Sequence, residues 1–182
     1  MITITFIIAA AVIIWLIISY NLFIRDRNLI KEAWSGIDVQ LKRRYNLIPN
    51  LVETVKGYAL HERKLFEDIT EKRSNTLSIN DRHEKAAAET DISGMLKNLF
   101  AVVENYPDLK ANVNFLDLQK QLTDIEDQLQ YARRYFNGTV RRYNIRIESF
   151  PSNIISAVFD FKQEEFFEIT FATERKVPEV KL

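Results

Sequence analysis

Side chains that could bind a metal ion or transfer a proton are few in this chain. It has two histidines, His61 and His83, and no cysteine. Helical proteins that hold two iron ions use Glu-x-x-His pairs on facing helices, whereas each histidine here is followed directly by a glutamate. Adjacent residues point to different faces of a helix, and the chain has neither a glycine-rich phosphate loop nor a nucleophile beside a base. The sequence therefore predicts no metal, no cofactor and no catalytic residue.

A basic run, Lys42-Arg43-Arg44, is the most conspicuous polar feature. It could contact anionic lipid headgroups or an acidic protein partner, because each basic residue contributes about 1 kcal/mol near an anionic leaflet. The alternative is a solvated helix face with local ion pairs. On a straight helix Lys42 lies roughly 27 Å beyond residue 24, well outside a Debye length of about 10 Å. The solvated face is the favoured interpretation, and lipid contact requires the helix to lie along the membrane.

A second candidate contact site consists of Asn46, Pro49 and Asn50. A proline inside a helix leaves a backbone carbonyl without its usual donor, and we expect Pro49 to bend the helix near Asn46. Asparagine side chains or a bound partner could use such a carbonyl. The simpler alternative, which we favour slightly, is that Pro49 only bends the helix to follow its neighbours.

Four aromatic residues, Tyr131, Tyr135, Phe136 and Tyr143, recur at helical spacing late in the chain. Such a stripe is more often buried core, with tyrosine hydroxyls at its rim, than a ligand or partner surface. We therefore expect these residues in the core. The acidic cluster at 124–127 is expected on the polar side of the same helix.

The first 24 residues carry no charge, and Arg25-Asp26-Arg27 follows at once. About 20 apolar residues suffice to cross a hydrocarbon core of roughly 30 Å, so residues 1–24 are predicted to form a transmembrane anchor that contacts the bilayer through residues 2–24. A cleaved signal peptide is disfavoured because the segment has no basic start and no small-residue site after its apolar core. Between residues 25 and 48 there are six lysines and arginines against three acidic residues, which predicts an outside N-terminus and a cytoplasmic body.

The body after the anchor, residues 25–182, has the length of one domain. All 25 basic and all 25 acidic residues fall within it, so its formal net charge is zero. A neutral domain lacks the basic footprint of nucleic-acid-binding proteins, and that class of partner is excluded. The low content of four glycines and four prolines favours long helices with few turns.

Apolar residues at steps of three and four predict an all-α fold. One long helix, bent at Pro49, is expected over 28–73. A second follows the capping signal Ser78-x-x-Asp81 and ends at Asn105-Tyr106-Pro107, and a third follows Asn114 and stops before Pro151. A short helix comes after Ser152, and the chain ends irregularly around 177–180. We expect the three long helices to pack as an antiparallel bundle, with the short helix against it.

Several long strings give the chain a close resemblance to the LemA family. They are AWSGIDVQLKRR at 33–44, LIPNLVETVKGYA at 47–59, ENYPDLKAN at 104–112 and ARRYFN at 132–137, with Tyr143-Asn144 and Phe150-Pro151. Two departures are Phe136, where tyrosine is expected, and Tyr45-Asn46, where His-Asp is more usual. The resemblance implies a bacterial membrane protein with one N-terminal span and a cytoplasmic helical bundle, and a magnetosome-membrane branch is known within the family. It supplies no catalytic residue.

The leading hypothesis is a membrane-anchored, non-enzymatic helical scaffold that offers its bundle to a protein partner. Residues Lys42, Arg43, Arg44, Asn46, Pro49 and Asn50 are the candidate contacts for that partner or for lipid. Two alternatives come from other classes: an accessory metal-binding or enzymatic domain, and a membrane-surface remodelling protein that binds anionic lipid. The sequence names neither the partner nor the oligomeric state, so self-association stays open.

Overall fold

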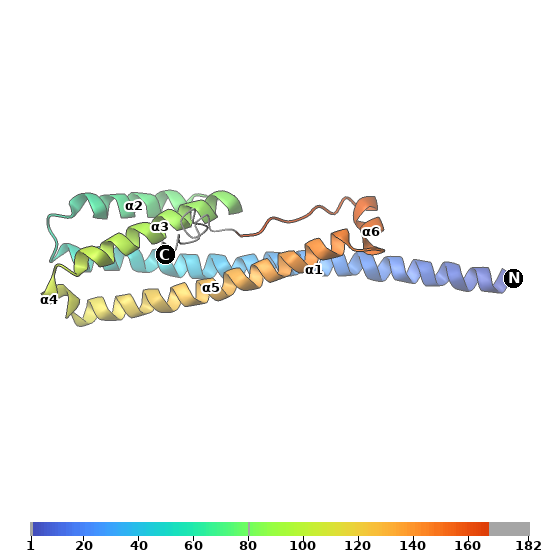
Figure 1. Ribbon diagram of the computed structural model, residues 1–182, viewed down its shortest axis with the longest axis horizontal. Helices are drawn as coiled ribbons and strands as arrows, with labels where there is room; N and C mark the ends of the chain where they lie inside the picture. The colour runs from blue at the N-terminus through green and yellow to red at the C-terminus, as the bar shows by residue number, and fades with distance from the viewer. Residues whose placement is uncertain (1, 80, 168–182) are drawn as a thin grey trace, which may run out of the picture. The chain divides into compact units, whose positions relative to one another are not determined.

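The computed structural model of the protein describes residues 2–79 and 81–167, and within these ranges it contains helices and no strand. The helices are α1 (Ile2–Lys56), α2 (Arg63–Leu77), α3 (Arg82–Val103), α4 (Pro107–Lys110), α5 (Val113–Glu148) and α6 (Ser152–Val158), labelled in Figure 1. The all-α fold predicted from the sequence is confirmed. The irregular end expected around 177–180 lies outside the described residues.

The described residues divide into two compact units. Unit 1 consists of residues 2–39 and 129–166, and unit 2 of residues 40–128 together with Phe167. Both α1 and α5 contribute to each unit. The predicted boundary between an anchor and a single domain at residue 24 stays a prediction.

The prediction of a single helix over 28–73 is wrong. Helix α1 ends at Lys56, and after a connection of residues 57–62 the chain enters α2. The amides of Tyr58 and Ala59 both donate to the Val55 carbonyl, which closes the last turn of α1. Gly57, which lowers helix stability by about 1 kcal/mol relative to alanine, is the one local signal for this end. Unit 2 thus contains four longer helical segments, from α1, α2, α3 and α5, where the prediction had three.

Contacts between these segments define an antiparallel arrangement of α1 and α5 in unit 2. Arg44 of α1 pairs with Glu126 of α5, and Tyr58, just after α1, accepts a hydrogen bond from Asn112, just before α5. Residue numbers therefore rise along α1 as they fall along α5. Helices α2 and α3 lie side by side (Figure 1) and are joined by the ion pair Lys72–Asp91.

Two helix starts differ from the predicted caps. Asp81, rather than Ser78, is the N-cap of α3, and its carboxylate accepts from the Glu84 amide at 2.9 Å. Ser78 instead follows α2, where its hydroxyl donates to the Asn75 carbonyl. At the start of α5 the side chain of Asn112, not Asn114, accepts from two backbone amides. Both caps satisfy amides that have no partner inside their helix.

Unit 1 pairs the first part of α1 with the second part of α5, again antiparallel. Phe23 lies edge-on to Tyr143 with ring centroids 6.1 Å apart, and Trp34 does the same against Phe136 at 5.6 Å. The apolar stripes predicted from periodicity supply these contacts. Ring pairs of this geometry contribute about 0.5–1.5 kcal/mol beyond the area they bury.

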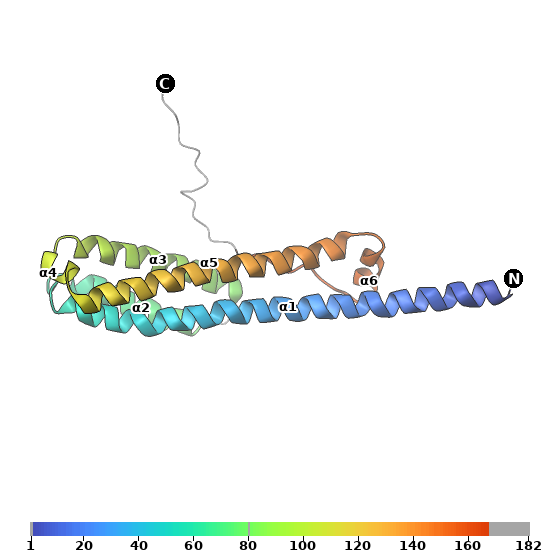
Figure 2. The ribbon, with the colours of Figure 1, turned by 90° about the horizontal axis from the view of Figure 1, so that it is seen from below.

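Helix α6 returns the chain from the end of α5 to α1 within unit 1 (Figure 2). It ends where Asp160 takes a positive φ of 52°, and the Phe161 amide then donates to the Ser156 carbonyl at 2.9 Å. This bond satisfies a carbonyl of the last helical turn. The turn places the Phe161 ring in a stack on Phe23, with centroids 4.7 Å apart.

The N-terminal part of α1 is long and apolar enough to cross a membrane, as judged by its length and composition. From residue 2 to residue 18 its side chains are exposed, apart from the half-buried Trp15. Coverage by the rest of unit 1 begins at Ser19 and becomes regular from Phe23 onward. The predicted apolar segment is thus a helix with an exposed uncharged surface.

Candidate functional site

A buried polar network occupies the interior of unit 2. The Arg44 side chain, with an exposed fraction of 4%, lies 3.3 Å from the Glu89 carboxylate and 3.4 Å from that of Glu126. Its second terminal nitrogen donates to the Ser93 hydroxyl at 2.9 Å. Glu89 is 1% exposed, and its other oxygen accepts a hydrogen bond from the Tyr45 hydroxyl. Side chains from α1, α3 and α5 therefore meet in one cluster.

Charges this deeply buried are tolerated only when they are paired and hydrogen-bonded. Here the guanidinium lies beside two carboxylates, and a phenol adds a neutral donor. The same network gives the Tyr45 hydroxyl a role, as a donor to the Glu89 carboxylate. Sequence periodicity could not reveal the network, because Arg44 reads as one member of an exposed basic run.

Pro49 lies inside α1, where it has no amide hydrogen to donate to the carbonyl of Tyr45, four residues earlier. In the structure the Nε of Arg73 donates to that carbonyl at 2.6 Å. The carbonyl released by the proline is thus taken up by α2, the helix that returns beside α1. The sequence had suggested that asparagine side chains or a bound partner could use this carbonyl, and in the structure Arg73 uses it.

The remaining candidate contact residues lie at the surface of unit 2. Lys42, Arg43, Asn46 and Asn50 are exposed, whereas Arg44 belongs to the buried network. Arg43 donates to the Gln40 side chain at 3.0 Å, and the Asn50 carbonyl accepts from Thr54. A shallow pocket of about 230 Å³ lies beside them, lined by Arg43, Asn46, Leu47, Gln121, Asp124 and Ile125.

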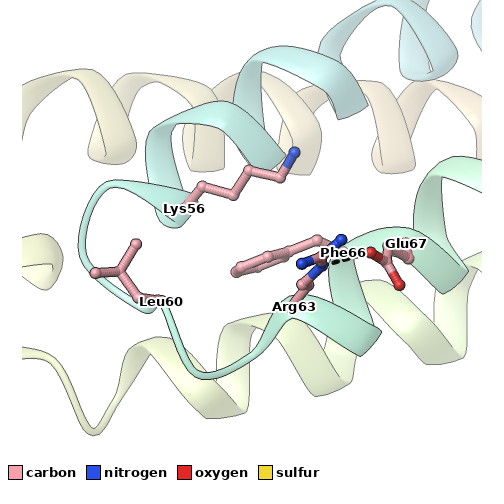
Figure 3. A pocket seen from close by; sticks show the side chains of 5 residues that line it. All are labelled: Lys56, Leu60, Arg63, Phe66 and Glu67. Atoms are coloured by element: carbon pink, nitrogen blue, oxygen red, sulfur yellow. Dashed lines mark hydrogen bonds and ion pairs between the residues drawn. The ribbon is translucent and has the colours of Figure 1, made fainter.

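A larger open pocket of about 400 Å³ lies where α1 turns back into α2. Figure 3 shows Leu60 and Phe66 facing each other across it, with Lys56 on one side. Arg63 donates to Glu67 at 2.8 Å, which raises the pKa of the Arg63 guanidinium above its ordinary value. The lining combines apolar walls with one lysine and an internally paired arginine, a set that specifies no particular ligand.

No group of three or more histidine, cysteine, aspartate or glutamate side chains in the described residues could hold a metal ion. His61 and His83 are both exposed. In the acidic cluster at 124–127, Ile125 is buried and Glu126 is drawn into the Arg44 network.

The aromatic stripe on α5 divides into two pairs. Phe136 and Tyr143 are buried as expected, whereas Tyr131 and Tyr135 are exposed, so the core assignment is wrong for these two. Tyr131 carries the Arg134 guanidinium over its ring at 4.7 Å. Burial, followed by the nearby Glu164 carboxylate, raises the pKa of the Tyr143 phenol.

A second buried acidic residue, Asp26, organises unit 1 and was not singled out as a site by the sequence. It is 1% exposed, and its carboxylate accepts from Arg146 at 2.8 Å and lies 3.3 Å from Arg142 and 3.8 Å from Arg25. The Arg146 guanidinium also lies 5.9 Å from the Phe23 ring centroid. The available signal was a lone acid between two arginines directly after the uncharged segment.

Replacing Arg44, the cation of the unit 2 network, tests how much the network contributes to stability. Arg44→Met leaves the Glu89 carboxylate buried without its arginine, which should lower the free energy of unfolding by about 3–5 kcal/mol. The double variant Arg44→Met/Glu89→Leu should recover most of the loss. Denaturant unfolding of the detergent-solubilised chain, followed by circular dichroism, measures both. Arg63→Met, at an exposed pair, is the control and should leave the midpoint unchanged; an equal effect of both single changes would refute the network.

A double-mutant cycle tests the link between Pro49 and Arg73. Arg73→Met should cost about 1–3 kcal/mol, because the Tyr45 carbonyl loses its donor. Pro49→Ala alone should be neutral or stabilising, since alanine restores a backbone donor. In the Pro49→Ala background Arg73→Met should therefore cost less. The same unfolding assay measures all four chains, and additivity within about 0.5 kcal/mol would contradict the link.

Comparison with known proteins identifies relatives of this chain. The model of the LemA family matches residues 33–182. The magnetosome proteins MamQ 1 of Paramagnetospirillum magneticum and MamQ of Magnetospirillum gryphiswaldense are 24% and 25% identical to this chain, over 87% and 86% of it and 68% and 67% of their own lengths. Protein LemA of Metamycoplasma hominis is 27% identical over 81% of this chain and 68% of its own. The match to the family model covers most of the chain, which therefore belongs to the LemA family.

Proposed function

We propose that this protein is a membrane-anchored, non-enzymatic scaffold that holds a helical bundle on the cytoplasmic side of a bacterial inner membrane. The observation that carries the proposal is the surface of α1, which is uncharged from residue 2 to residue 18 and exposed there apart from Trp15. Membrane association also agrees with the magnetosome proteins among its relatives. Residues 2–24 cross the bilayer, and α1 continues beyond them to Lys56 without a break.

The orientation follows from the charges after the apolar segment. Arg25 and Arg27 come first, and Lys31, Lys42, Arg43 and Arg44 follow within the next 17 residues. Because positively charged flanks stay in the cytoplasm, the N-terminus lies outside. Asp26 does not weaken this bias, since acidic residues contribute little to orientation and Asp26 is itself paired with arginines.

The scaffold role is supported by how unit 2 uses its polar groups. Arg44, Glu89 and Arg73 connect helices to one another, so the buried polar side chains serve the fold. The exposed residues Lys42, Arg43, Asn46, Pro49 and Asn50 then form the surface that meets a protein partner, with the pocket beside Asn46 as its centre. Turnover by the purified chain that one point change abolishes would overturn this proposal.

Topology can be read with single cysteines, because the chain has none of its own. A cysteine at Thr3, at the outer end of the crossing segment, should react with an impermeant maleimide in intact cells. A cysteine at the exposed Ser74 should react only after lysis. Labelling at Ser74 in intact cells, with none at Thr3, would reverse the orientation.

Partner capture is tested by changing one exposed charge. Arg43→Glu should reduce the yield of cross-linked partner in intact cells, as measured by mass spectrometry, because the changed charge repels an acidic partner and the residue borders the pocket. Lys64→Glu, the same charge change at another exposed basic residue on α2, is the matched control and should leave the yield unaltered. Equal yields from Arg43→Glu and the unchanged chain would remove this surface from the proposal.

A further inference from the structure

A second uncharged stretch, residues 149–159, carries α6 and the turn before it. Between Glu148 and Asp160 there is no ionisable side chain. The stretch is too short to cross a membrane, and hydropathy alone does not distinguish it from a core helix.

Most of the apolar side chains in this stretch face away from the protein. Phe150 is 81% exposed and Val158 is 71% exposed, with Ile154 and Phe159 each at least half exposed. Only Ile155 and Ser156 are buried in α6. Exposed apolar residues gathered on one short element mark a surface that contacts something other than water.

Contacts with α1 show which part of the uncharged segment 2–24 lies beside α6. The Phe159 ring lies 4.8 Å from that of Tyr20, and Phe161 stacks on Phe23. Coverage of α1 begins at Ser19, which lies five residues, or about 8 Å, before the end of the uncharged segment at residue 24. Helix α6 is therefore level with the last uncharged turns of α1.

Excluding α6 from the bilayer would leave a membrane span shorter than the hydrocarbon core. Residues 2–18 form about 26 Å of helix, whereas the hydrocarbon core needs roughly 30 Å. If residues 2–24 cross, α6 lies about 5–10 Å inside the boundary, which is the depth of interfacial helices.

The serine hydroxyls of the stretch are hydrogen-bonded within the protein, which suits a site with little water. The hydroxyl of Ser149 donates to the Ile145 carbonyl, that of Ser152 to the Arg146 carbonyl and that of Ser156 to the Ile147 carbonyl. Each distance lies between 2.7 and 3.1 Å. Hydroxyls bonded within the protein avoid the cost of entering an apolar medium unpaired.

Hydrogen bonds also join the two segments of chain that flank the stretch. The side chain of Asn144 donates to the Glu164 carbonyl at 2.8 Å and accepts from the Glu164 amide at 3.0 Å.

The Arg27 guanidinium lies over the Phe161 ring, 5.8 Å from its centroid. Along α1, charged residues thus follow directly after the aromatic residues Tyr20 and Phe23, an order typical of a membrane–water interface.

We propose that α6 and Phe150 form an interfacial membrane-binding element, which inserts Phe150, Ile154, Val158 and Phe159 into the lipid beside α1. Lipid is the occupant because this apolar surface continues the exposed surface of α1 at the same level. The inference rests on the proposed crossing of the membrane by residues 2–24.

Single cysteines in the full chain test the proposal in vesicles of phosphatidylethanolamine and phosphatidylglycerol. Ile8→Cys, Val158→Cys and Lys162→Cys each receive a polarity-sensitive fluorophore, and quenching is measured with lipids brominated near the top of the acyl chain and with aqueous iodide. All three positions are exposed, so the labels displace no core side chain. Phe150→Cys supplies a second position on the proposed element.

The label at Val158 should be quenched by brominated lipid several-fold more strongly than the label at Lys162, and more weakly by iodide. Equal behaviour of these two labels overturns the inference. A Val158 label shielded from both quenchers also overturns it, because a second protein surface then covers α6. The Ile8 label separates the two proposals: if it is not quenched by lipid, the membrane crossing fails and the inference falls with it.

Discussion

Helix α1 remains a single helix from Ile2 to Lys56 while its surroundings change along its length. Its backbone hydrogen bonds are internal apart from the one at the Tyr45 carbonyl, which accepts from Arg73. The side chains must therefore match each environment. Uncharged side chains are exposed as far as residue 18, Asp26 enters a cluster of arginines, and Arg44 is buried among carboxylates. Both compact units include part of α1, and α5 likewise contributes to both.

The two deeply buried acids, Asp26 and Glu89, each connect two helices within their own unit. Each is 1% exposed, and each accepts a hydrogen bond from an arginine on another helix. Apolar stripes allow two helices to shift by one turn at modest cost, whereas a buried carboxylate loses its arginine in such a shift and is left unpaired. We infer that these pairs fix the register of the helices more than they add to stability.

Periodicity was sufficient to predict the fold class, the burial of Phe136 and Tyr143, and the helical apolar segment at the N-terminus. It failed at Gly57, because Ala59, Phe66 and Ile69 continue the stripe in phase although the chain has reversed direction. It also misplaced Arg44, whose burial depends on Glu89 and Glu126, acids far away in sequence. Pairings of this kind require the tertiary arrangement and leave no local pattern, and the same holds for Arg73 and the Tyr45 carbonyl.

A single membrane-crossing helix is free to rotate about its own axis, and this freedom matters for a scaffold that must offer a defined surface. A second lipid contact at α6, displaced from that axis and tied to it by Phe161 and Asn144, would remove the rotation for unit 1. Hydropathy cannot identify such an element, because seven residues acquire a membrane role only from the helix to which they are attached. The Asp26 cluster, which joins the end of α5 to α1 just beyond this level, then transmits the fixed orientation into the paired helices.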